Sequence, residues 1–256
     1  MVIRAVSLQS GSNGNCLYVE AGGARLIFDA GIPGSRVEAG LRALGREVRD
    51  VDAVIISHDH ADHVLKAGVF QRKFGLPLFF TPRTLEEALA RHPLGKLRDV
   101  HYFLAGGTLA FGEARVRSIP TRHDGVDGAG FVVTAGGKSL GILTDLGHAF
   151  QGLGEVLSTL DGVFLESNYD PEMLRRGPYP RSLKRRIEGP GGHLSNREAA
   201  ELLREYGKGL RWACLAHLSE TNNALALALR THRSILAPGL PLRVASRYAP
   251  TGVLTL

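Results

Sequence analysis

Cysteine is scarce in this sequence, and a long apolar run is missing. Only two cysteines occur among 256 residues, Cys16 and Cys214. They lie far apart, which fits small buried side chains in a reducing compartment and leaves a disulfide between them open. No window approaches the length of a membrane span, and residues 1–8 have a strand-like pattern where a signal peptide would have its apolar core. We therefore expect a cytoplasmic protein with no segment in a membrane.

Short repeats and low-complexity linkers are also missing. The composition is that of an ordinary globular protein, with 44% hydrophobic and 22% charged residues, which excludes a disordered or collagen-like chain. A chain of this length can bury a substantial core, and α/β chains of similar size often form one domain. We expect residues 1–256 to form a single domain. The sequence does not predict its oligomeric state.

Acidic residues are in the minority. The 25 aspartates and glutamates face 31 lysines and arginines, a formal net charge of +6, which favours a polyanionic partner. A cluster precedes the glycine-rich turn at 189–192 and consists of Arg175, Arg176, Arg181, Lys184, Arg185 and Arg186. The planar guanidinium fork suits bidentate contacts with phosphate. A coding bias toward arginine would explain the scattered arginines, but it explains the cluster less well.

Three imidazoles and two carboxylates fall within six residues at His58-Asp59-His60-Ala61-Asp62-His63. The preceding residues, 51–57, form a short and mostly β-branched apolar run that predicts a buried strand. Such a strand delivers the ligands into a loop at the carboxyl edge of a sheet, with His58 and His60 pointing the same way. Neutral imidazole and carboxylate suit Zn²⁺, Mn²⁺ or Fe²⁺, and no cysteine lies nearby to indicate a closed structural zinc site. The motif predicts a metal site.

Strands and helices alternate along the chain. Apolar and β-branched runs predict strands over residues 2–8, 16–20, 25–28, 51–56, 78–80, 108–111, 114–119, 130–134, 139–143, 161–165 and 212–215. Helices are predicted over residues 36–44, 64–74, 195–205 and 222–231, and from Thr81-Pro82 onward. This order predicts an α/β fold, a four-layer αβ/βα sandwich with two sheets packed face to face and helices outside.

Five segments, in this order along the chain, resemble the motifs of the metallo-β-lactamase superfamily. They are L-I-F-D-A-G at 26–31, S-H-D-H-A-D-H at 57–63, I-P-T-R-H at 119–123, G-I-L-T-D at 141–145 and L-A-H-L-S at 215–219. Together they are highly specific for the four-layer fold. They are less specific for the substrate, because many chemistries occur on this fold.

The resemblance also implies two divalent metal ions per chain, with zinc or manganese expected and iron as the alternative. One ion would be held by His58, His60 and His123, and the other by Asp62, His63 and His217, while Asp145 would bridge them. A shared carboxylate and a bridging hydroxide suit an in-line displacement at phosphorus or at a carbonyl carbon. Asp62 is also expected to take part in catalysis.

Two histidines, His193 and His217, lie in similar motifs, but only His217 ends an apolar strand as the other ligands do. Glu166 ends another strand and resembles the tRNase Z position where a glutamate supports a histidine. We expect Glu166 to hold His193 protonated, so that it donates a proton to the leaving group; the alternative is a surface carboxylate beside a turn residue. Asp29 is expected to fix the metal loop by hydrogen bonds, and Asp59 either does the same or is merely solvated.

The glycine-rich segment 10–15 joins the first two predicted strands. Its backbone N–H groups and side chains suit a phosphate, although a plain turn would use the same residue types. The residues expected to bind substrate are Ser10, Ser12, Asn13 and Asn15 in this loop, and Arg181, Lys184, Arg185 and Arg186 in the basic cluster. Aromatic platforms for stacking bases are not prominent; Tyr169, Tyr179 and Phe150 are candidates that packing explains equally well.

Within the superfamily, three further motifs resemble the YycJ/WalJ-like branch: S-G-S-x-G-N-C at 10–16, G-H-L-S-N at 192–196 and A-H-L-S-E-x-N-N at 216–223. That branch is associated with exonuclease activity on single-stranded DNA. The interval between Asp145 and His217 is too short for the β-CASP domain of RNase J-like enzymes. The resemblance implies a metal-dependent nuclease, with single-stranded DNA as the expected partner. A small-molecule hydrolase (a cyclic phosphodiesterase, lactonase or thioesterase) and a metal-binding protein without turnover are the alternatives.

Overall fold

Two seven-stranded sheets form the centre of the protein in a computed structural model that describes residues 2–256. The first sheet contains, in spatial order, β14 (Leu254–Thr255), β1 (Arg4–Gln9), β2 (Cys16–Ala21), β3 (Ala24–Phe28), β4 (Ala53–Ile55), β5 (Leu78–Phe80) and β6 (Val100–Tyr102). The second contains β13 (Leu242–Val244), β12 (Trp212–Ala216), β11 (Gly162–Glu166), β10 (Lys138–Leu143), β9 (Ala129–Ala135), β8 (Ala114–Pro120) and β7 (Thr108–Phe111).

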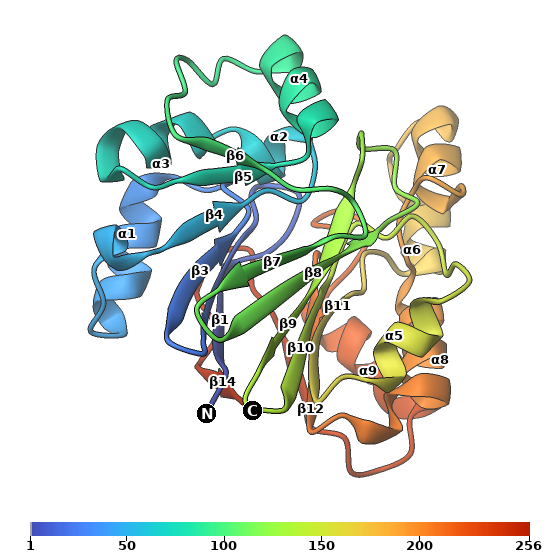
Figure 1. The fold of residues 1–256 in the computed structure, drawn as a ribbon. Coiled ribbons are helices and arrows are strands. Elements are labelled where there is room, and N and C mark those ends of the chain that lie inside the picture. Colours follow the sequence, from blue (N-terminus) through green and yellow to red (C-terminus); the bar gives the residue numbers. More distant parts are fainter. Residues whose placement is uncertain (1) are drawn as a thin grey trace.

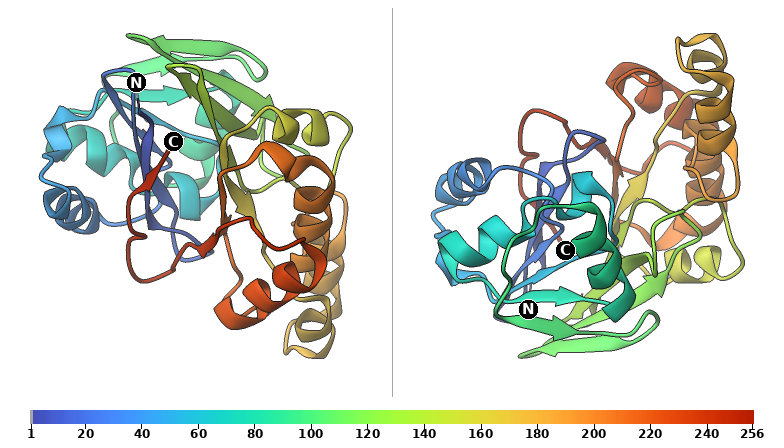
Figure 2. Two further views of the ribbon diagram at one scale, coloured as in Figure 1. Left: turned by 90° about the horizontal axis from the view of Figure 1, so that it is seen from below. Right: turned by 90° about the horizontal axis from the view of Figure 1, so that it is seen from above.

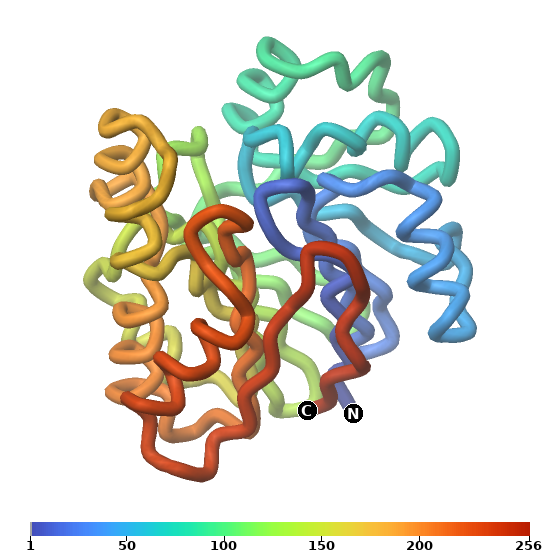
Figure 3. Tube along the Cα trace, turned by 180° about the vertical axis from the view of Figure 1, so that it is seen from behind, coloured from blue at the N-terminus to red at the C-terminus, as the bar shows by residue number. Residues whose placement is uncertain are grey.

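Helices cover the outer face of each sheet (Figure 1). Beside the first sheet lie α1 (Gly34–Ala43), α2 (Ala61–Val64), α3 (Ala67–Phe74) and α4 (Pro82–Arg91). Beside the second lie α5 (Leu153–Ser158), α6 (Pro171–Arg176), α7 (Arg181–Glu188), α8 (Asn196–Tyr206) and α9 (Leu225–Ile235). The views from below and above, and the view from behind, show the two groups of helices on opposite sides of the molecule (Figures 2 and 3). The predicted four-layer αβ/βα sandwich is confirmed.

Alternation along the strands explains why they are apolar on both faces. In β3, Leu26 and Phe28 belong to the core between the sheets, whereas Ile27 belongs to the core under α1 and α3. In β11, Phe164 faces the core between the sheets, and Leu165 packs under α5 and α8. Successive side chains of a strand point to opposite faces, so a strand between two apolar layers needs apolar residues at every position.

The predicted elements match the structure where they are long or well capped. Ser195 and Glu198 form a capping box at the start of α8, the helix predicted from residue 195, and the Thr81 side chain accepts a hydrogen bond from the Thr84 N–H at the start of α4. The helix expected over 64–74 instead begins at Ala61 and is interrupted between α2 and α3. On α3 the inward-facing side chain is Phe70, which is fully buried, whereas its neighbour Val69 is 38% exposed.

The parallel pairing of the strands brings the predicted site residues to one edge of the two sheets. Strands β3 to β6 run parallel to one another, as do β10 to β13, and the loops that follow them meet at the carboxyl ends of both sheets.

Both cysteines are buried free thiols. Within residues 2–256, no helix combines the length and apolar character needed to cross a bilayer.

Candidate metal centre

The predicted ligands come together at the carboxyl edge shared by the two sheets. The loop after β4 and the start of α2 provide His58, His60, Asp62 and His63, while His123, Asp145 and His217 follow β8, β10 and β12. A cavity of about 360 Å³ opens above them, and most of these side chains line it; His58 and His63 lie buried beneath. The segments that follow four different strands therefore converge on one small volume.

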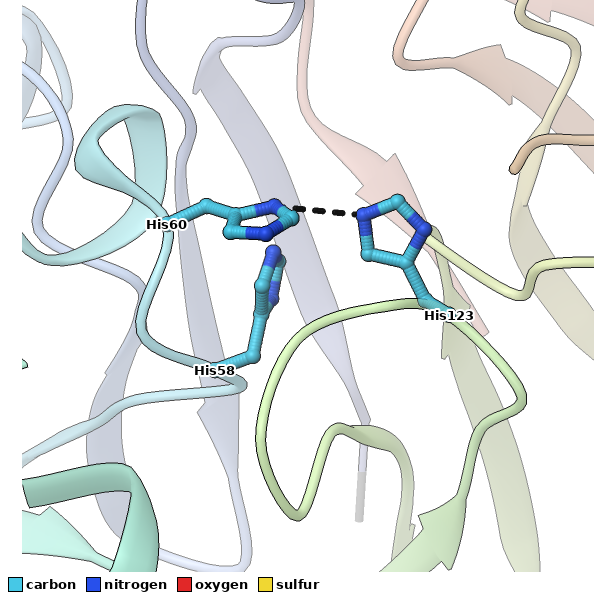
Figure 4. Close-up of side chains that lie close together, drawn as sticks. All are labelled: His58, His60 and His123. Carbon is cyan, nitrogen blue, oxygen red and sulfur yellow. Dashed lines mark hydrogen bonds between the residues drawn. The ribbon is translucent and has the colours of Figure 1, made fainter. Parts of the chain in front are cut away.

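Three histidines form one side of the cluster (Figure 4). One nitrogen from each of His58, His60 and His123 lies within 4.8 Å of the others. The Nδ1 of His123 donates to the Gly192 carbonyl at 2.7 Å, so its Nε2 carries the lone pair and lies 3.2 Å from the His60 Nδ1. The His58 Nδ1 lies 2.9 Å from the Ser57 hydroxyl. Burial, together with the neighbouring imidazoles, holds the pKa of His58 well below its ordinary value, so this ring is neutral.

Asp62, His63 and His217 form the other side. The Asp62 Oδ2 lies 3.3 Å from the His217 Nε2 and 3.6 Å from the His63 Nε2. The His63 Nδ1 is 2.7 Å from the Asp29 Oδ2. Carboxylates that hold the far nitrogen of a histidine fix its orientation and make it a stronger ligand. The other oxygen of Asp29 accepts a hydrogen bond from the Ser57 N–H at 2.8 Å, so this carboxylate contacts the His63 ring and the backbone of the same loop.

Asp145 lies between the two groups. Its Oδ2 is 3.2 Å from the His63 Nε2, and its Oδ1 is 3.7 Å from the His123 Nε2 and 3.5 Å from the His217 Nδ1. Burial raises the pKa of this carboxyl, but the imidazoles of His217 and His63 outweigh burial and hold the pKa well below its usual range. Asp145 is therefore an ionised carboxylate in contact with histidines from both groups.

Three residues of the site have a left-handed backbone. Asp29, Asp145 and His217 have φ angles of 66°, 53° and 55°, in a region that costs a residue other than glycine about 1–3 kcal/mol. Each follows the last residues of a strand, and the left-handed turn redirects the chain there. Gly31 shows how tightly this edge is packed, because a Cβ at that position would lie 1.8 Å from the Asp62 carbonyl oxygen.

The side chains fit a divalent cation. Among residues 2–256, the buried His58 Nε2 and Asp145 Oδ2 have no hydrogen-bond partner, which is costly unless something else satisfies them. The surrounding donors are imidazole nitrogens and carboxylate oxygens, the set that zinc, manganese and iron accept. The cluster is thus compatible with a metal centre.

His193 and Glu166 form a pair beside the ligands. The His193 Nδ1 is 2.6 Å from the Glu166 Oε1, and Glu166 is fully buried and also accepts the Leu146 N–H at 3.0 Å. Burial lowers the pKa of His193. The charge of Glu166 and its hydrogen bond raise that pKa by more than burial lowers it, so the net shift is upward. Gly192 permits this arrangement, since a Cβ there would lie 2.0 Å from the Ile187 carbonyl oxygen. The alternative of a surface carboxylate is wrong for Glu166.

The sequence is similar to those of known proteins. The sequence model of the metallo-beta-lactamase superfamily matches residues 10–204. This chain belongs to the metallo-beta-lactamase superfamily. The exodeoxyribonuclease WalJ of Streptococcus pneumoniae is 36% identical over 233 residues, which are 90% of this chain and 87% of WalJ. The exodeoxyribonuclease YycJ of Bacillus anthracis is 32% identical over 232 residues, with the same shares.

Structural similarity extends over the whole metallo-beta-lactamase fold. The crystal structure of the metallo-beta-lactamase fold protein YhfI from Bacillus subtilis aligns over 100% of both chains with a TM-score of 0.76 and 16% sequence identity. At that identity the likeness concerns the fold alone.

The glycine-rich loop of this metallo-beta-lactamase domain lies partly beneath the ligands. Ser10 and Asn15 are buried: the Ser10 hydroxyl accepts the His217 N–H at 2.8 Å, and the Asn15 Nδ2 lies 3.0 Å from the His63 Nε2. Asn13 is exposed and donates to the Arg247 carbonyl at 3.3 Å. Ser12 alone of the four lines the cavity. Ser10 and Asn15 thus contact the predicted ligands His217 and His63 from below.

The basic cluster also has one member at the cavity and the others away from it. Arg186 lines the cavity and pairs with Asp124 at 2.6 Å. Arg175 and Arg176 pair with Glu172, and Lys184 donates to the carbonyls of Arg175 and Gly177. Arg181 and Arg185 lie exposed on α7. Only Arg186 reaches the site, while Arg181 and Arg185 lie farther along the same helix.

Three polar residues lie near the centre without being predicted ligands. Asp59 is fully buried; it accepts the Val126 N–H at 2.7 Å and pairs with Arg91 at 3.1 Å, so it supports the loop and is not a solvated residue. Asp124 lies 3.4 Å from the His60 Nε2 and 3.5 Å from the His123 Nε2. Asn168 donates to the His217 carbonyl at 2.8 Å. Asn168 comes two residues after the end of β11 at Glu166, and this position is the one signal in the sequence for its role.

Proposed function

We propose that this protein is a metal-dependent phosphodiesterase, an exodeoxyribonuclease that acts on single-stranded DNA. The observation that carries the proposal is the pair of three-residue ligand groups with the ionised Asp145 in contact with both. The WalJ and YycJ exodeoxyribonucleases, related over 90% of this chain, support the nuclease activity. The exposed arginines of α7 support a polyanionic substrate.

The ligand set suits two ions, with zinc or manganese expected and iron as the alternative. His58, His60 and His123 would hold one, Asp62, His63 and His217 the other, and Asp145 both. When bound, the ions supply the positive charge that activates water and stabilises charge developing on the phosphate. Asp62, which lines the cavity, offers a carboxylate that accepts a proton. His193, held through Nδ1 by Glu166, keeps Nε2 for the departing oxygen.

We also propose a cellular compartment and a domain organisation for this protein. We place the activity in the cytoplasm, where two buried free thiols are stable, and we treat residues 1–256 as one hydrolase domain, because the core between the sheets draws on both halves of the chain.

An end-labelling assay tests the activity. The purified protein is incubated with Mn²⁺ or Zn²⁺ and with end-labelled single-stranded DNA, RNA of the same sequence, or bis-p-nitrophenyl phosphate. We expect the DNA to shorten progressively from one end and RNA to be degraded much more slowly. Turnover of the small diester with no shortening of DNA would contradict the nuclease and favour a small-molecule hydrolase.

Arg185 is expected to contact the strand outside the cavity. Each phosphate contact contributes about 0.7 to the slope of log affinity against log salt for single strands, so Arg185→Glu should lower that slope by about 0.7 and weaken binding. Fluorescence anisotropy with a labelled oligonucleotide at several salt concentrations measures both quantities. Arg42→Glu on α1 is the matched control, because it makes the same charge change on an exposed arginine beside the other sheet. Equal effects of the two variants would exclude a specific contact.

A further inference from the structure

One wall of the cavity is apolar. Tyr179, Leu183 and Ile187 line the same cavity as the histidines and carboxylates. These three side chains belong to a small hydrophobic cluster with Tyr169 and Leu174, separate from the main cores. Tyr179 and Leu183 are only half-buried. An aromatic ring and a leucine left partly open beside charged groups offer a flat apolar surface to whatever enters.

Local contacts fix this wall in place. Tyr179 lies in the short connection between α6 and α7, with a proline on each side, and its hydroxyl is 3.2 Å from the Thr221 Oγ1. Proline restricts the backbone on both sides of the ring. Lys184 closes the same connection by donating to the carbonyls of Arg175 and Gly177 at 2.8 and 2.7 Å. The ring is thus held in position before any substrate arrives.

The side chain of Arg186 lies between the apolar wall and the predicted metal ligands. Arg186, one residue before Ile187 on α7, pairs with Asp124 at 2.6 and 3.1 Å. Asp124 in turn lies 3.4 Å from the His60 Nε2. A phosphate bound at the ligands therefore has a guanidinium close by, and the apolar wall begins on the same helix. A nucleotide combines an anionic phosphate with a flat base, so it matches a site in which a guanidinium adjoins an apolar surface.

We propose that Tyr179, Leu183 and Ile187 form a subsite for one unstacked nucleobase, with its ring against Tyr179 and its phosphate at the metal ligands beside Arg186. The subsite rests on the proposed nuclease function and gives it a cause for single-strand preference. Bases within a duplex are stacked and paired and present no free face, whereas a single strand exposes one. Every base has such a face, so the subsite predicts little sequence preference.

Substrates that lack one base test the subsite. Single-stranded oligonucleotides carry one abasic nucleotide at the first or second position from the digested end and are compared with the intact strand. Stacking of a base on an aromatic side chain is worth about 5- to 150-fold in affinity. The wild-type protein should therefore show a higher KM, by a factor in this range, for one of the abasic strands. Tyr179→Ala should show the same rise on the intact strand and no further rise on the abasic one, while Tyr179→Phe should behave like the wild type.

The controls separate three outcomes. Tyr102→Ala removes a tyrosine that is 58% exposed on β6 and does not line the cavity, and it should leave KM unchanged. Thermal unfolding shows whether Tyr179→Ala is folded. If the wild-type protein shortens no DNA, the proposed function fails. If it shortens intact and abasic strands with equal KM, or if Tyr179→Ala keeps the full difference between them, the nuclease stands and the nucleobase subsite is wrong.

Discussion

Asp145→Asn is expected to reduce phosphodiester hydrolysis by about 10³-fold, because metal-assisted charge stabilisation is worth several kcal/mol in such sites. Among residues 2–256, Asp145 is the one carboxylate that contacts histidines of both ligand groups, so its loss should also lower the metal content measured by inductively coupled plasma spectrometry. Asparagine is preferable to alanine here, since the backbone is left-handed and asparagine tolerates that conformation.

Asp127→Asn is the matched control. Asp127 also has a left-handed backbone, with φ of 49°, but its side chain pairs with Arg83 and does not line the cavity. The same substitution in the same conformation should leave turnover and metal content close to those of the wild type. Full metal content and turnover in Asp145→Asn would show that the two ligand groups do not share this carboxylate.

His193→Ala is expected to retain its metal and to lose about 10²–10⁴-fold in turnover on DNA, the usual worth of a positioned proton donor. The physical reason is the 2.6 Å contact with the buried Glu166, which holds the imidazole at the cavity. The loss should be much smaller on bis-p-nitrophenyl phosphate, because p-nitrophenolate departs without a proton. Steady-state rates on both substrates, with metal analysis of the same sample, provide the measurement.

His217→Asn separates a ligand from a proton donor. His217 lies 3.3 Å from the Asp62 Oδ2 within one ligand group, so this variant should lose metal and should lose turnover on both substrates alike. Asparagine again suits the left-handed backbone. Metal loss in His193→Ala with retention in His217→Asn would mean that the two histidines have exchanged roles.

Much of the site could be predicted because its residues follow strands. His58, His123, Asp145 and His217 each come just after an apolar run, and apolar runs predict strands well. Parallel strands end at one edge, so residues far apart in sequence can be placed together by topology alone. The fold followed from the same runs, and the strand predicted over 78–80 has the bounds observed for β5.

The rest depends on contacts that no local pattern encodes. The pairing of Arg186 with Asp124 joins residues 62 positions apart, and the burial of Ser10 and Asn15 beneath the ligands depends on how the loop packs against Asp62 and His217. Strand β14 has only two residues, and in β13 Arg243 interrupts the apolar run, so neither strand has the apolar run that predicts β5. Helix α7 has one buried residue in eight, so its basic sequence was interpreted as a charge cluster and not as a helix that forms a wall of the site.

Each ligand group draws on both sheets. His58 and His60 follow a strand of the first sheet and His123 one of the second, and Asp62 and His63 are likewise joined by His217. A cation held there fastens the two halves of the sandwich together. Because an unfolded chain has no such site, free metal at 100 times its dissociation constant adds about 2.7 kcal/mol to the free energy of unfolding. Metal supply would then govern the resistance of this protein to proteolysis, and so its lifetime in the cell, as well as its activity.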